Sequence, residues 1–114
     1  MAIPDEIKVV VELSLVSFIE QRVPPHVRDK VRLSYRFRGN FVTLYEDRPA
    51  FRKPSEWVKI PVAQFRFDPE RSDWTLYCAD RNSKWHEYFD LESNHDFDVL
   101  LEEVNEDPTG IFWG

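Results

Sequence analysis

The sequence predicts an α+β domain: an N-terminal helix, a five-stranded antiparallel meander sheet, and a C-terminal helix followed by an aromatic tail. Five central segments alternate between apolar and polar residues, as strands with one buried face do. Short polar turns separate these segments, so consecutive strands can pair as hairpins. We expect both terminal helices to cover the same face of the sheet. A chain of 114 residues is long enough for one hydrophobic core and too short for two, which predicts a single domain over residues 1–114.

The first helix is expected within residues 3–22. Pro4 and the acidic residues after it suit a first helical turn, where proline is tolerated and negative charge interacts favourably with the helix dipole. The sequence Val23-Pro24-Pro25 ends the element. A β-branched run at residues 9–11 would also suit a strand, so the pattern alone leaves both assignments open. The apolar arc is wide enough to be buried on two sides, in the domain core or against a second copy of the chain.

The first hairpin is expected from residues 31–38 and 41–46. Its connection is Gly39-Asn40, a two-residue turn with glycine at the position where a type II′ turn needs a positive φ. In the resulting register Arg38 lies opposite Phe41, and the apolar side chains of both strands share one face. The arginine, threonine and tyrosine side chains share the other face.

Three more strands are expected at residues 57–67, 73–79 and 84–89. The first of them should be kinked at Pro61, because proline cannot donate to a central ladder. The segment from Asp47 to Glu56 is expected to be a loop. With symmetric turns, the last of them near Arg81-Asn82, the inner face toward the helices holds Ala63, Phe65, Phe67, Trp74, Leu76, Cys78, Trp85 and Phe89. The outer face then holds Gln64, Arg66, Thr75, Tyr77, Lys84, His86 and Tyr88.

The second helix is expected over residues 96–106, where Phe97, Leu100, Leu101 and Val104 recur at helical spacing. An aromatic tail follows it, and two interpretations of this tail remain open. The apolar residues 111–113 either fold back to seal the core or form a plug for another protein. Folding back is favoured, because a free apolar terminus promotes aggregation.

The expected environment of the protein is aqueous and reducing. No window approaches the roughly 18 uncharged apolar residues of a membrane span. The start of the sequence also lacks the basic and apolar regions of a secretory signal. We therefore expect a cytoplasmic protein that does not enter a membrane. The single cysteine, Cys78, stands in mid-strand and is expected to be a small core residue rather than a nucleophile.

Charge is divided unevenly along the chain. Residues 22–88 contain 14 of the 15 basic residues and nine of the 21 acidic ones, a net charge of +5, whereas the flanks carry −11. The basic field therefore lies over the predicted sheet. There it can attract an anionic ligand even though the whole protein is acidic.

The outer face of the predicted sheet is the candidate site. The residues expected to bind a ligand are Arg36, Arg38, Tyr45, Arg66, Tyr77, His86 and Tyr88. Guanidinium, phenol and imidazole groups at alternate positions provide phosphate donors and stacking planes, as in sheet platforms for single-stranded nucleic acid. The competing interpretation is an ordinary solvated face, because arginine opposite tyrosine or threonine is also common on exposed antiparallel sheets.

The sequence indicates no catalytic residue, no metal site and no cofactor. Its three histidines, His26, His86 and His95, are spread over separate expected elements. Neighbouring residues of a strand point to opposite faces, so His86 and Glu87 cannot jointly hold a metal ion. The three glycines do not form a phosphate-binding loop. An enzyme of unrecognised type is therefore the least supported class.

Three segments resemble a known family. They are RVPPHVRDKVRLSYRFRGNFVTLYEDRP, WTLYCADRNSKWHEY and the C-terminal DPTGIFWG. All three are similar to short bacterial proteins catalogued as domain of unknown function 3024. The resemblance implies a small stand-alone bacterial protein, and it carries over no activity, ligand or catalytic residue.

Together these observations predict a non-enzymatic binding module with an anionic partner, nucleic acid included, on the outer sheet face. The alternative is a protein-interaction or homodimeric role through the first helix and the aromatic tail. Salt separates the two possibilities, because contacts to phosphate weaken steeply as salt rises and apolar association does not.

Overall fold

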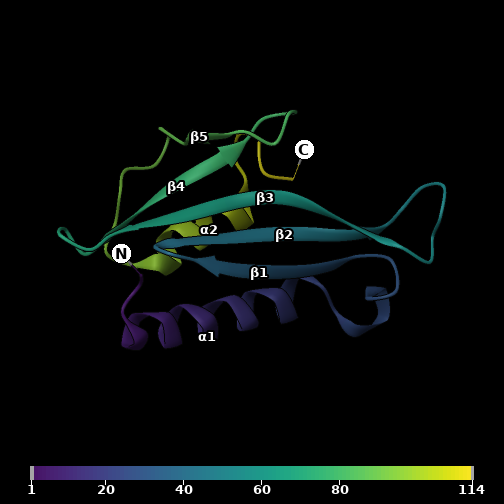
Figure 1. Cartoon of the computed structure of the whole chain (residues 1–114), viewed down its shortest axis with the longest axis horizontal. Coiled ribbons are helices and arrows are strands. Elements are labelled where there is room, and N and C mark those ends of the chain that lie inside the picture. The colour runs from purple at the N-terminus through teal and green to yellow at the C-terminus, as the bar shows by residue number, and fades with distance from the viewer. Residues whose placement is uncertain (1, 114) are drawn as a thin grey trace.

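A computed structural model describes residues 2–113. Its elements are α1 (Asp5–Arg22), a 3-10 turn (Pro25–Val27), β1 (Arg32–Arg38), β2 (Phe41–Pro49), β3 (Trp57–Asp68), β4 (Asp73–Ala79), β5 (Trp85–Glu87) and α2 (Phe97–Glu106). The five strands form one antiparallel sheet in sequence order, with α1 alongside β1 and α2 behind the sheet in the view of Figure 1. The predicted α+β class and meander topology are confirmed.

Helix α1 forms despite the β-branched run in its first half. The amide of Lys8 donates to the carbonyl of Pro4 (2.9 Å) and closes the first turn. The helix ends at Arg22, shortly before two prolines that have no amide hydrogens with which to continue the ladder. Only one stripe of the helix is fully buried, through Val11 and Leu15.

The β1–β2 hairpin has the predicted register. Gly39 takes a φ of 59°, as the first central residue of a type II′ turn requires, and Arg38 pairs with Phe41. Arg36 consequently lies opposite Thr43, on the face turned away from the helices. The turn thereby determines which side chains of both strands reach the outer face.

A β-bulge in β3 accommodates Pro61. Leu44 pairs with Ala63 and Tyr45 pairs with Pro61, so Val62 is an extra residue with no partner in β2. A bulge tolerates proline inside a sheet because the regular ladder is already interrupted there. The predicted kink at this residue is therefore a bulge, which also increases the local twist of the sheet.

Strands β2 and β3 continue past the end of β1. Strand β1 begins at Arg32, opposite Asp47, whereas β2 and β3 pair as far as Pro49 and Trp57. Residues 48–58 form a two-stranded arm that projects from one end of the sheet (Figure 1). We call it the β2–β3 arm. The prediction of a loop from Asp47 onward is wrong for its first three residues, because Pro49 stands at the end of the ladder, where a missing amide donor costs little.

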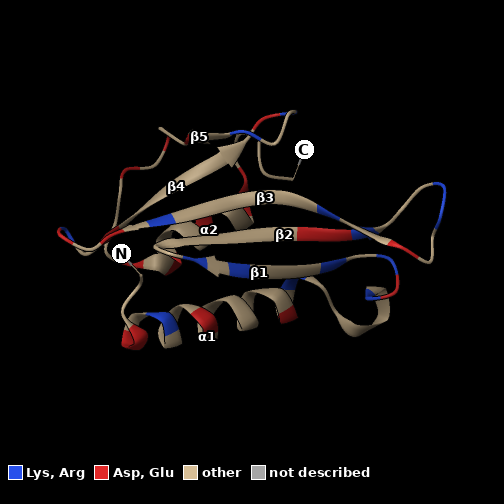
Figure 2. Cartoon of the chain, viewed as in Figure 1, with Lys and Arg blue, Asp and Glu red and all other residues tan. Residues whose placement is uncertain are grey.

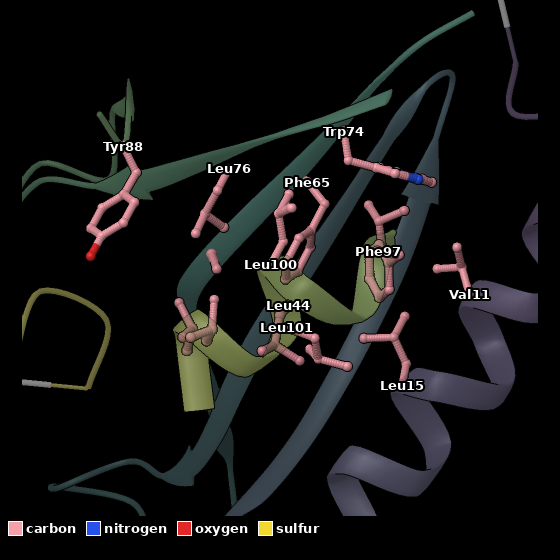
Figure 3. Packing of buried hydrophobic residues seen from close by; sticks show 14 of the residues in the cluster. Val11, Leu15, Leu44, Phe65, Trp74, Leu76, Tyr88, Phe97, Leu100 and Leu101 are labelled. Carbon is pink, nitrogen blue, oxygen red and sulfur yellow. The ribbon is translucent and has the colours of Figure 1, made fainter. Parts of the chain in front are cut away.

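Both helices contribute to one hydrophobic core on the inner face of the sheet (Figure 3). The ring centroid of Phe97 in α2 lies 4.7 Å from that of Phe65 and 5.1 Å from that of Trp74. Val11 and Leu15 of α1 reach the same cluster from the side. Six residues predicted for the inner face are buried as expected: Ala63, Phe65, Phe67, Trp74, Leu76 and Cys78.

Strand β5 does not have the predicted register. Ala79 pairs with Trp85, and Cys78 pairs with His86. Trp85 therefore faces the outer side and His86 stands on the inner side of the ladder, the reverse of the prediction. The reason is a three-residue turn at residues 81–83, whose last residue has a φ of 61°. Such a turn contains one residue more than the two-residue turn that the prediction assumes.

Two further placements change with this register. The prediction of Tyr88 on the outer face is wrong, because this residue is buried in the core and its amide donates to the carbonyl of Leu76 (2.9 Å). The prediction of Phe89 on the inner face is also wrong, because its side chain is 83% exposed. A register shift of one residue moves each following side chain to the opposite face, which explains both corrections.

The aromatic tail folds back onto the domain, as favoured by the sequence. Asp107 takes a left-handed conformation, and its carboxylate accepts hydrogen bonds from the amides of Phe112 (3.1 Å) and Trp113 (2.9 Å). The ring of Phe112 is buried against Tyr88, with 5.1 Å between centroids. The indole nitrogen of Trp113 donates to a carbonyl of α2 (2.7 Å). Gly114 lies outside the described residues.

Candidate functional site

A groove of about 500 Å³ crosses the outer face of the sheet. Its lining comes from four strands: Arg36 and Arg38 of β1, Phe41, Thr43 and Tyr45 of β2, Gln64 and Arg66 of β3, and Trp85 of β5. We call it the outer groove. It lies on the face away from both helices, and it contains basic side chains that the sequence predicts for the site.

The strand register brings these residues together. Two neighbouring levels of the ladder supply most of the lining, namely Arg36–Thr43–Gln64 and Arg38–Phe41–Arg66. Alternate residues of a strand share a face, so the two levels are about 7 Å apart along the strands. Three guanidinium groups thus gather around one hollow.

The floor of the outer groove is polar and ordered. Thr43 and Gln64 are 7% and 6% exposed. The amide nitrogen of Gln64 donates to the hydroxyl of Thr43 (3.1 Å), and its amide oxygen accepts a hydrogen bond from Nε of Arg66 (2.7 Å). Buried polar groups are costly unless they are hydrogen-bonded, so this network fixes the three side chains in one arrangement.

Arg66 is held between two aromatic rings. Its guanidinium carbon lies 3.7 Å from the ring centroid of Tyr77 and 4.5 Å from that of Phe41. Both rings lie against the guanidinium, and Nε is already bonded to Gln64. The two terminal nitrogens are the remaining donors, in the fork geometry that matches phosphate or carboxylate oxygens.

The arginines of the outer groove have no acidic partners. Within residues 2–113, none of Arg36, Arg38 and Arg66 forms an ion pair with a carboxylate. Figure 2 shows basic positions along β1 and acidic positions on both helices, so the carboxylates of this acidic protein are mostly elsewhere. Three unpaired positive charges in one partly enclosed groove repel one another and favour an anion.

Two predicted site residues are not part of the outer groove. The imidazole of His86 is at the sheet edge, with Nε2 2.8 Å from Oδ2 of Asp80. The hydroxyl of Tyr88 donates to Glu103 in the core (2.7 Å), and burial together with this bond raises the pKa of Tyr88 to about 12. Their predicted position on the outer face is therefore wrong, as a result of the β5 register.

The structure brings together the other five predicted residues. Arg36, Arg38, Tyr45 and Arg66 line the outer groove, and Tyr77 adjoins it through its contact with Arg66. Whether they bind a ligand stays a prediction. Trp85, which the sequence assigns to the core, is an addition to the site. Asp80 is the sequence signal that could have revealed this placement of Trp85. Aspartate side chains often accept hydrogen bonds from the backbone of the turn that follows, and Asp80 accepts them from the amides of Asn82 and Lys84, in a turn longer than two residues.

Acid is expected to weaken the β4–β5 hairpin through Asp80. Hydrogen bonds from His86 and from the amides of Lys84 and Asn82 hold the pKa of this carboxyl below its ordinary value. An aspartate in an unfolded chain has a pKa near 3.9. A carboxyl whose pKa is lower than this in the folded chain stabilises the fold at higher pH. It loses that effect as the pH falls through its pKa in the folded chain. The stability difference between the unmodified protein and Asp80→Asn should therefore shrink below about pH 4.

Urea denaturation at a series of pH values measures this difference. The expected stability difference is present above about pH 5 and decreases toward zero at lower pH. A difference that stays constant to about pH 2 would show that the charge of Asp80 does not stabilise the hairpin.

Other reactive groups lie away from the outer groove. Cys78 is buried, and burial raises the pKa of its thiol, so the predicted role as a small core residue is confirmed.

Among residues 2–113, no three His, Cys, Asp or Glu side chains are close enough to share a metal ion. No helix in this range is sufficiently long and apolar to cross a bilayer.

Comparison with known proteins adds a family but no activity. Residues 4–114, almost the whole chain, match the family described as Domain of unknown function (DUF3024), which confirms the resemblance seen in the sequence. No curated protein and no solved structure matches the chain. The outer groove is therefore the feature from which a function can be inferred.

Proposed function

Since the chain belongs to the DUF3024 family, whose description names no activity, we propose a function from the residues of the outer groove. The protein is a non-enzymatic binding module for an anionic partner that also carries planar rings. Single-stranded nucleic acid is the partner class that combines both properties.

The observation that carries the proposal is the fixed guanidinium of Arg66, which has no carboxylate partner within residues 2–113. Two rings and the Gln64 oxygen hold it in place before any ligand arrives. A group that is already ordered loses little conformational entropy on binding, so more of its interaction energy appears as affinity. Arg36 and Arg38 add positive charge on the same rim.

Aromatic walls favour nucleic acid over a simple anion. Tyr45 and Trp85 are half-buried in the lining, which leaves part of each ring accessible to a base. Stacking of a base on such a ring contributes about 1–3 kcal/mol and tolerates any sequence. The amide and hydroxyl of the floor lie within the same hollow and supply hydrogen-bonding groups for a base edge.

The alternative function is association through α1. Val9, Val10, Leu13 and Val16 are exposed on the helix surface that faces away from the core. This stripe supports a protein-interaction or homodimeric role. The tail, the other surface of this alternative, packs on its own domain through Phe112 and Trp113. Oligomeric state measured by sedimentation at low and high salt separates the functions, because apolar association persists at high salt.

We also propose that the protein is bacterial and acts in the cytoplasm. The resemblance to short bacterial proteins supports the first part, and the single cysteine, which is free and buried, supports the second. A free thiol is typical of a reducing compartment.

Replacing Arg36 and Arg66 together by glutamine is expected to weaken binding of a labelled oligothymidylate at least about tenfold at low salt. The slope of log affinity against log salt should also become shallower by roughly 0.7 for each phosphate group that the variant no longer neutralises. Fluorescence anisotropy at several salt concentrations measures both quantities.

Arg81→Gln is the matched control, because Arg81 is an exposed arginine in the β4–β5 turn, outside the outer groove. It should bind like the unmodified protein. Inorganic polyphosphate is the second probe, and it should bind more weakly than the oligonucleotide if the rings stack on bases. If the unmodified protein does not bind the oligonucleotide even at low salt, the outer groove is an ordinary solvated face and the proposal fails.

A further inference from the structure

A second set of cation–aromatic contacts lies on the outer face. The guanidinium of Arg32 is 4.0 Å from the ring centroid of Trp57, and Nζ of Lys59 is 5.1 Å from that of Tyr45. These four residues stand where the β2–β3 arm leaves the sheet. We call them the arm-base cluster.

The arm-base cluster continues the line of the outer groove. Arg32 and Lys59 both pair with Asp47, which is four residues along β2 from Thr43 on the groove floor. Four residues of a strand span about 13 Å. Tyr45 lies between the two levels and belongs to both sets, since it lines the outer groove and also contacts Lys59.

Arg32 provides the free charge of the arm-base cluster. The carboxylate of Asp47 is neutralised by Nζ of Lys59 at 3.1 Å, and this ammonium also donates to Ser34 (2.8 Å). Arg32 uses Nε for the carbonyl of Arg28 (2.9 Å) and, among the residues described, has no carboxylate partner. Like Arg66, Arg32 has its guanidinium against an aromatic ring and Nε already bonded, although it contacts one ring where Arg66 contacts two.

The β2–β3 arm extends the same line with an exposed ring. Phe51 at its tip is 98% exposed, so it makes almost no contact with the rest of the chain. Arg52 beside it has no ion pair within residues 2–113. From Phe41 in the outer groove to Pro49 in the arm, β2 alone spans about 27 Å.

We infer that the outer face binds an extended strand of nucleic acid rather than a free nucleotide, with one part of the strand in the outer groove and the next part on the arm-base cluster. This inference rests on the proposed function and specifies its ligand. A mononucleotide can occupy the groove but cannot reach Arg32 and Trp57 at the same time. A strand that reaches both sets binds the second one intramolecularly, at a high effective concentration, which raises its affinity.

The test is a titration of the protein with thymidine monophosphate and with oligothymidylates of about 4, 8 and 12 nucleotides. These lengths lie within the site size of roughly 4–16 nucleotides that single-strand-binding folds occupy. The variants are Arg32→Gln with Trp57→Ala, Arg36→Gln with Arg66→Gln, and Arg81→Gln as the matched control. For the unmodified protein, affinity should rise at least about tenfold from the monophosphate to the longer strands and then level off.

Each variant has a distinct expected pattern. The arm-base variant should lose the gain from length while binding the monophosphate as the control does. The groove variant should weaken binding of the monophosphate and of all the strands. Two results would overturn the inference and leave the proposed function standing. One is equal affinity of the unmodified protein for the monophosphate and the strands. The other is an arm-base variant that binds long strands as tightly as the control does. Absence of binding to any probe would instead overturn both.

Discussion

Deleting residues 111–114 is expected to lower the free energy of unfolding by about 3–5 kcal/mol, the range found when large aromatic side chains are removed from cores. Phe112 is buried against Tyr88, and Trp113 donates to α2 and stacks on the guanidinium of Arg22 at 3.9 Å. The deletion removes both rings and exposes the Tyr88 end of the core to water. Total stabilities of domains are about 5–15 kcal/mol, so the truncated chain should be close to the limit of folding.

Urea denaturation followed by circular dichroism measures this effect, with Ile111→Ala as the control. Ile111 belongs to the same tail but is exposed, so its truncation should cost less than about 1 kcal/mol. Phe112→Ala gives an intermediate loss if the full deletion does not fold. An unchanged unfolding midpoint after deletion would mean that the tail does not pack on the core in solution, and it would favour a partner-binding tail.

Replacing Trp74 by alanine is expected to cost about 3–5 kcal/mol. The indole is fully buried in the core, with ring centroids of Phe67 and Phe97 at 4.9 and 5.1 Å. Figure 3 shows it next to Phe97 of α2. Its removal leaves a cavity between the sheet and α2 that the surrounding rings cannot fill without leaving their preferred rotamers. The backbone of residue 74 also pairs with Asn94, so the loss should loosen the start of α2 as well.

Trp57→Ala is the matched control for this prediction. Trp57 lies on the β2–β3 arm and is partly exposed, so its loss should lower stability by about 1 kcal/mol or less. Thermal or urea denaturation of both variants provides the comparison. Equal destabilisation by the two substitutions would contradict the assignment of Trp74 to the core and of Trp57 to the surface.

Much of the sheet could be predicted because its first turn is specified locally. Glycine before Asn40 favours one turn type, that turn sets the register of β1 and β2, and strict alternation then assigns each side chain to a face. The same reasoning places Phe65, Leu76 and Trp74 correctly, since the turn between β3 and β4 does not shift the ladder.

The errors in the prediction come from features that depend on turn length or on distant contacts. A turn of three residues in place of two moves Trp85 to the outer face and Tyr88 to the core. Periodicity cannot reveal such a shift, because both registers preserve alternation. The arm escapes prediction for a different reason: proline usually indicates a loop, and nothing local shows that Pro49 is at the end of a ladder.

The candidate site could be predicted in composition but not in geometry. Alternation places Arg36, Arg38 and Arg66 on one face, which requires no knowledge of the tertiary structure. The stacking of Arg66 between two rings and the burial of Gln64 depend on side chains from three strands, so the sequence alone could not show them. The same applies to the lack of acidic partners around these arginines among residues 2–113.

The contact between the end of α1 and the C-terminal part of the chain has a consequence for the order of folding. Arg22, at the end of α1, donates to Asn105 of α2 (3.0 Å) and stacks on Trp113. Hairpins between successive strands close short loops and form early, whereas this contact joins segments 83 residues apart and must form late. During synthesis α1 leaves the ribosome before α2, yet its buried residues Val11 and Leu15 belong to a core cluster that is incomplete until α2 follows. The first helix to be made is therefore expected to be the last to dock, and the nascent chain is most exposed to misassembly in that interval.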